Sequence, residues 1–166
     1  LVVYDLGDVY LPAGQIPDVA TGAGYAEVTE SNLVDDGTKT LTSATGRITA
    51  LQTFSGFDGE VVSVTYTVDV APVASLDWSY LYLTDSTGSA LYTVSTAAPV
   101  TAGTHTVTLP LPYAIAAGTT YGFKLDLIDF PTESFTIGVA YSNGDYADGA
   151  LTTPTGSGAA AGDDLT

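Results

Sequence analysis

The feature that most constrains this chain is an alternation of apolar and polar residues with a period of two. Its longest run covers residues 62–70, where Val62, Val64, Tyr66, Val68 and Val70 alternate with Ser, Thr and Asp. Successive side chains of a β-strand point to opposite faces, so this run predicts a strand with one face on a core and the other in water. No window of useful length has the periodicity of an amphipathic helix.

Shorter runs of strand-forming residues recur between glycines and prolines. They cover residues 1–10, 38–41, 48–54, 76–84, 90–94, 105–111, 121–127 and 135–141. Roughly eight to ten strands at this spacing predict an all-β fold, an antiparallel β-sandwich of jelly-roll type with little or no helix. We expect one domain over residues 1–166, with an N-terminal strand and irregular extension over 1–47 and a jelly-roll-like core over 48–166.

Within this plan, two strand ends have further features. Pro110 and Pro112 are expected to interrupt the hydrogen-bond ladder of the strand over residues 105–111, with Leu111 facing inward. Residues 142–164 are rich in Gly, Ala and Thr, and predict a long loop that returns to a last strand. That strand is expected to begin at Leu165 and to be cut short at Thr166.

The run over residues 76–84 is apolar on both sides. Trp78, Tyr80 and Tyr82 share one face, whereas Leu81 and Leu83 share the other. A row of aromatic rings can form a platform that stacks on the apolar faces of sugars, and it can equally be sheet core or a packing interface. Both interpretations stay open at this point.

The charge balance restricts the partners. Nineteen acidic residues face three basic ones, Lys39, Arg47 and Lys124, so the net charge is −16. Such a field repels phosphate backbones and anionic lipid surfaces, so we expect no nucleic-acid partner and no membrane insertion. The chain has no cysteine, which excludes disulfides and thiolate metal sites. The low share of charged residues, 13 %, is typical of extracellular proteins and of cell or virion surfaces.

The acidic loop near the C-terminal end is the candidate metal site. Its oxygen-bearing residues are Asn143, Asp145, Asp148, Asp163 and Asp164. Calcium takes six to eight oxygen ligands from carboxylates, carbonyls and water, so a structural calcium ion could hold this loop. Asp and Asn are also common turn formers, which is the alternative.

Catalytic chemistry has little support. The chain has one histidine, His105, expected among the polar residues of its strand, and it has no Gly-x-Ser-x-Gly elbow. Asp126, Asp129 and Glu133 are the carboxylates that a glycoside hydrolase would need, but any acidic sandwich offers such groups. We therefore expect no enzyme.

Several corner motifs resemble those of a known family. They are Gln52-Thr53-Phe54, Asp85-Ser86-Thr87-Gly88, Ala117-Gly118-Thr119-Thr120-Tyr121, Tyr141-Ser142-Asn143-Gly144 and Asp164-Leu165-Thr166. From about residue 48 to residue 166 the chain resembles bacterial cell-surface jelly-roll domains that occur beside cell-wall anchors and carbohydrate-active modules. The resemblance implies an adhesive or sugar-binding role at a surface, and residues 1–47 fall outside it.

Three functions follow as hypotheses. The first is a non-catalytic structural subunit or surface module of an extracellular assembly, such as a filament, a surface layer or a virion exterior. Its subunits would associate by strand addition through the apolar N-terminal residues Leu1, Val2, Val3, Tyr4 and Leu6. The second is a carbohydrate-binding adhesion module that uses Trp78, Tyr80 and Tyr82, and the third is a glycoside hydrolase.

Overall fold

The computed structural model describes residues 37–73, 75–129, 134–143, 149–158 and 163–165. The strands are β1 Gly37–Ser43, β2 Arg47–Ser55, β3 Gly59–Val70, β4 Trp78–Asp85, β5 Ala90–Ser95, β6 Gly103–Ile115, β7 Thr120–Ile128, β8 Phe135–Asn143, β9 Leu151–Thr155 and β10 Asp163–Leu165. The predicted all-β fold is confirmed. The described residues include no helix of the length and apolar character that crossing a membrane requires.

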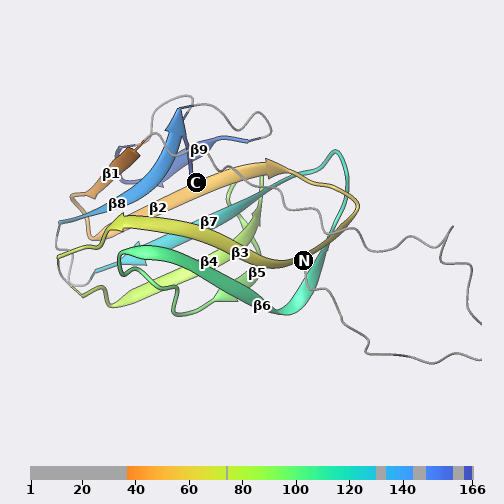
Figure 1. Ribbon diagram of the computed structural model, residues 1–166, viewed down its shortest axis with the longest axis horizontal. Helices are drawn as coiled ribbons and strands as arrows, with labels where there is room; N and C mark the ends of the chain where they lie inside the picture. The colour runs from red at the N-terminus through yellow and green to blue at the C-terminus, as the bar shows by residue number, and fades with distance from the viewer. Residues whose placement is uncertain (1–36, 74, 130–133, 144–148, 159–162, 166) are drawn as a thin grey trace, which may run out of the picture. The chain divides into compact units, whose positions relative to one another are not determined.

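The strands form two antiparallel sheets that pack face to face (Figure 1). Sheet A has the order β1-β8-β3-β6, with β10 also paired to β8, and sheet B has the order β5-β4-β7-β2-β9. The pairs β1·β8, β2·β7, β3·β6 and β4·β5 are all antiparallel. The first eight strands are therefore one long hairpin, closed by the β4–β5 pair and rolled up so that the other successive strands cross between the sheets, which is the predicted jelly roll.

The core lies between the inner faces of the two sheets. Its fully buried large side chains include Leu41, Ile48, Val68, Leu83, Leu127 and Ile137. On β4 and β7, the inward residues Leu81, Leu83, Leu125 and Leu127 are buried, as the period of two predicted. The side chains that alternate with these leucines along the two strands therefore point to the outer face of sheet B.

Part of that outer face is also covered. Leu51 on β2 is buried although it points away from the core, because Gly88 in the β4–β5 turn lies against it. Gly122 on β7 has no space for a side chain, since a Cβ atom there would lie 2.6 Å from Leu51 Cδ1 and 2.9 Å from Thr84 Oγ1. The turn and the sheet thus fit closely at this end of β4.

The predictions for β6 hold in part. Pro110 and Pro112 interrupt the ladder with β3 as predicted, because the pairing passes directly from Thr108 to Tyr113 where the register shifts between Val61 and Ser63. The strand itself continues to Ile115 at the edge of sheet A, and Leu111, predicted to face inward, is turned outward with 67 % of its surface exposed. His105 does not lie with the polar residues, since its ring packs beside Tyr66 at 5.6 Å.

Three further differences concern the region after β8 and the end of β3. The region predicted as a long loop contains β9, which pairs with β2 at the edge of sheet B, where Pro154 is tolerated. The last strand begins at Asp163 rather than Leu165. Val70, predicted to face the core, is exposed because the β3–β8 register shifts beside it. The predicted assembly residues Leu1, Val2, Val3, Tyr4 and Leu6 lie outside the described residues.

Tyr66 generates a prediction for alkaline solution. The Tyr66 ring is buried, and its hydroxyl donates a hydrogen bond of 2.5 Å to the Pro99 carbonyl. Burial raises the pKa of Tyr66 to about 12. In the unfolded chain the pKa of a tyrosine hydroxyl is about 10. The contribution of Tyr66 to stability is therefore fully present below about pH 10 and is lost as pH rises through about 12. We expect an absorbance titration of the tyrosines to contain a phase near pH 12 that Tyr66→Phe removes. A titration that keeps this phase in the variant would contradict the assignment.

Candidate functional site

The aromatic row of β4 stands on the outer face of sheet B. Because Leu81 and Leu83 point inward, Trp78, Tyr80 and Tyr82 point outward and share one face, which is the arrangement that the sequence left open between sheet core and exposed platform. Trp78 has 47 % of its surface exposed, whereas Tyr80 and Tyr82 are half-buried. These residues are not part of the core between the sheets. We call them, together with Arg47 and Asp126, the β4 platform.

The three rings are not equivalent. The rings of Tyr80 and Tyr82 lie 5.9 Å apart and are inclined by 28° to each other. The ammonium group of Lys124 lies over the Tyr82 ring, 5.1 Å from its centroid. Burial raises the pKa of Tyr82, and the Asp126 carboxylate raises it further. Tyr82 is thus packed between Tyr80 and Lys124. Of the three rings, Trp78 has the largest exposed surface.

An ion pair lies beside the row. The Arg47 guanidinium donates from Nε to Asp126 Oδ1 at 2.8 Å and from Nη2 to Asp126 Oδ2 at 2.6 Å. The Asp126 side chain is only 5 % exposed, whereas that of Arg47 is 49 % exposed. This bond to Asp126 raises the pKa of Arg47. A buried carboxylate therefore fixes a half-exposed guanidinium in one orientation.

The strand register places this ion pair next to the rings. Asp126 on β7 is opposite Tyr80 on β4, while Ile128 is opposite Trp78 on one side and Arg47 on the other. Trp78 and Arg47 are thus in register across the sheet and two strands apart, at a separation of about 10 Å. On this face Ile128 thus lies between an aromatic ring and a hydrogen-bond donor.

The β4–β5 turn closes the opposite end of the platform. Asp85 Oδ1 accepts hydrogen bonds from the backbone N–H and the hydroxyl of Thr87, at 2.8 and 2.7 Å, and from the N–H of Ser89 at 3.0 Å. These bonds, led by the Thr87 hydroxyl, lower the pKa of Asp85. Lys124 Nζ donates to the Gly88 carbonyl at 2.7 Å, which ties the turn to the sheet.

The residues predicted to hold calcium are only partly within the described chain. Asn143 and Asp163 are register partners in β8 and β10, and Asp145 and Asp148 lie outside the described residues. Asp164 is 1 % exposed and accepts a hydrogen bond of 3.1 Å from Gln52 Nε2. No cluster of three or more His, Cys, Asp or Glu side chains that could hold a metal occurs among the described residues. The calcium site stays a prediction.

The carboxylates considered for glycoside hydrolysis differ in placement. Asp126 is held by Arg47, and Asp129 is buried with its backbone N–H bonded to the Gly46 carbonyl at 2.8 Å. Glu133 lies outside the described residues. His105 Nε2 lies 2.6 Å from the Thr101 carbonyl.

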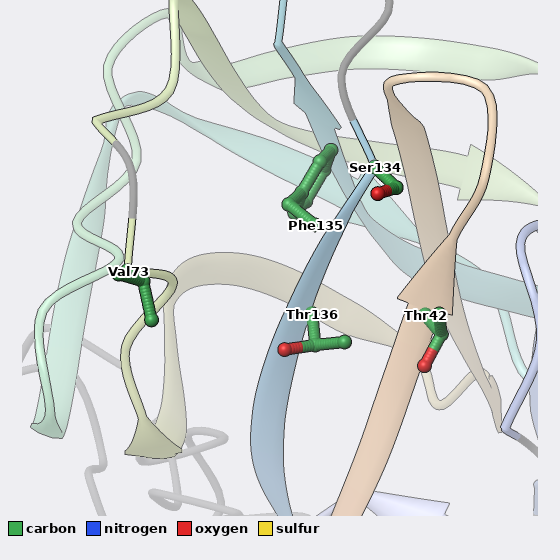
Figure 2. Close-up of a pocket in the computed structure, with 5 residues that line it drawn as sticks. All are labelled: Thr42, Val73, Ser134, Phe135 and Thr136. Carbon is green, nitrogen blue, oxygen red and sulfur yellow. The ribbon is translucent and has the colours of Figure 1, made fainter.

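None of the described residues that line a hollow elsewhere on the molecule is ionisable. Figure 2 shows Thr42 on β1 and Thr136 on β8 side by side, with Val73 on the β3–β4 connection across from them. Ser134 and Phe135 complete its lining. Hydroxyls and apolar groups alone offer little for catalysis, so the β4 platform is the better candidate site.

The sequence analysis missed Arg47 and Lys124 as members of the site. Both were treated only as rare positive charges, because the sequence does not say which strands are neighbours. The parity of β7, which puts Lys124 and Asp126 on the face opposite Leu125, was the available signal. Arg47 joins them only through the β2–β7 register.

The ion pair generates an asymmetric prediction for stability. Arg47→Ala would leave the nearly buried Asp126 carboxylate without its partner, so we expect a loss of about 2–3 kcal/mol. Asp126→Asn leaves a half-exposed guanidinium that water can solvate, so its loss should stay near 1 kcal/mol. Urea unfolding of both variants and of the double variant measures this. A greater loss for Asp126→Asn than for Arg47→Ala would contradict it.

Comparisons of the chain with protein families, with curated proteins and with solved structures find no match.

Proposed function

We propose that this protein is a non-catalytic surface module of an extracellular assembly, and that it binds carbohydrate through the β4 platform. The observation that carries the proposal is the outward row of Trp78, Tyr80 and Tyr82 with the Arg47–Asp126 pair beside it. An exposed tryptophan on a sheet face, next to an oriented guanidinium, matches the two kinds of surface that a sugar ring presents.

The chemistry of sugars explains this match. One face of a pyranose ring is lined by C–H groups and packs against an aromatic ring, whereas its hydroxyls need hydrogen-bond partners at the edge. Trp78 supplies the apolar surface, and Arg47 supplies donors to hydroxyl oxygens. Tyr80 extends the row, and Tyr82 beneath Lys124 supports it.

The platform is also pre-organised. Its aromatic residues come from a central strand of sheet B, and Arg47 is fixed by two bonds to Asp126. Side chains that are already fixed lose little conformational entropy on binding. This favours binding by a rigid surface over binding by an adaptable loop.

The alternative functions have less support from the described residues. Assembly by N-terminal strand addition through Leu1, Val2, Val3, Tyr4 and Leu6 stays a prediction, because it concerns residues outside the described ones. A filament, a surface layer and a virion exterior are all compatible with a carbohydrate-binding module. Glycoside hydrolysis would need a pair of acids with opposed roles, and Asp126 is already engaged by Arg47.

The proposal predicts the effect of removing the exposed ring. Trp78→Ala should weaken binding to a soluble glycan at least about tenfold, which corresponds to about 1.4 kcal/mol of lost stacking. Affinity electrophoresis against a panel of soluble polysaccharides, followed by calorimetry on those that retard the protein, measures this. Thr106→Ala, on the outer face of sheet A, is the matched control and should bind as the native protein does. Equal binding by Trp78→Ala would rule out the platform.

A further inference from the structure

We infer that the β4 platform takes neutral glycans and discriminates against those that carry carboxylate or sulfate groups, an inference that rests on the proposed function. It follows from how the charges around the aromatic row are engaged. Two of the three basic residues of the chain, Arg47 and Lys124, lie beside the aromatic row. An acidic ligand would therefore be expected to bind there. Both of these basic residues are already engaged.

Arg47 is neutralised by Asp126. Two of its three guanidinium nitrogens donate to the two carboxylate oxygens, at 2.8 and 2.6 Å. An acidic sugar near Arg47 would therefore also lie near Asp126, whose charge opposes it. A sugar hydroxyl accepts from the remaining nitrogen, Nη1, without this repulsion.

Lys124 is engaged in a similar way. Its ammonium donates to the Gly88 carbonyl at 2.7 Å and lies 5.1 Å from the centre of the Tyr82 ring. Its position is fixed inside the platform, between the ring and the turn. These contacts hold the β4–β5 turn against the sheet, and they use one of the three N–H donors of the ammonium, so an anion could reach Lys124 only through the donors that remain.

Carboxylates stand at both ends of the aromatic row. Asp77 is exposed and directly precedes Trp78, and Asp85 ends β4 after Tyr82 and Thr84. The hydrogen bonds to Asp85 stabilise its ionised form. The formal charges are thus +2 from Arg47 and Lys124 and −3 from Asp77, Asp85 and Asp126, in a chain of net charge −16. Like charges brought together disfavour a partner, so this field selects against anionic sugars.

The test compares sugars that differ only in charge. Soluble neutral polysaccharides, namely hydroxyethyl cellulose, laminarin and galactomannan, are each paired with a derivative in which C6 primary alcohols are oxidised to carboxylates. For each polymer that binds, we expect the neutral form to bind at least about tenfold more tightly at low salt. The ratio should fall as ionic strength rises, because salt screens the repulsion.

Variants and outcomes separate this inference from the proposed function. Asp77→Lys should reduce the ratio, whereas Glu60→Gln, a charge change on β3 in sheet A, should leave it unchanged. If both members of a pair bind equally, or the acidic one more tightly, and Trp78→Ala abolishes both, the charge inference is overturned and the proposed function stands. If no polymer binds, the proposed function is overturned, and this inference with it.

Discussion

Burial of the leucines of β4 and β7 between the two sheets is the constraint on which the site depends. Leu81, Leu83, Leu125 and Leu127 are removed from water on the inner face of sheet B. Each contributes about 1.5–3 kcal/mol by the usual relation between area and free energy. A slip of one residue would expose all of them, so their burial fixes the register. The same register puts Trp78, Tyr80 and Asp126 together on the outer face.

Under the proposed function, the two faces of sheet B divide stability from recognition. The inner face needs only apolar residues of suitable volume, whereas the outer face can carry an ion pair and exposed rings without disturbing the core. Among the described residues, this small region collects Arg47 and Lys124. The negative field opposes self-association. Arg47 is paired with Asp126, and Lys124 is engaged by the Gly88 carbonyl and the Tyr82 ring, which is why we propose that the platform is no anion site.

The alternation of single strands was enough to predict the sandwich and which side chains share a face on β4 and β7, but not which face of β4 is turned to the core. It failed where the period is broken: the register shifts beside Val70 and around Leu111 cannot be read from local pattern. β9 was missed because Pro154 and its Thr-rich surroundings look like loop, and only the edge position makes them acceptable. The Arg47–Asp126 pair joins residues 79 positions apart, so it depends on which strands are neighbours.

Trp78 is the only tryptophan of the chain, so its fluorescence reports on the platform alone. The most direct measurement is a titration of the native protein with a polysaccharide that it has been found to bind. Tryptophan emission and its quenching by acrylamide are recorded at each step of the titration. We predict that emission shifts to shorter wavelength and that quenching falls, with the same half-saturation as binding measured by calorimetry. Binding that leaves both the emission and the quenching of Trp78 unchanged would place the ligand elsewhere and contradict the account.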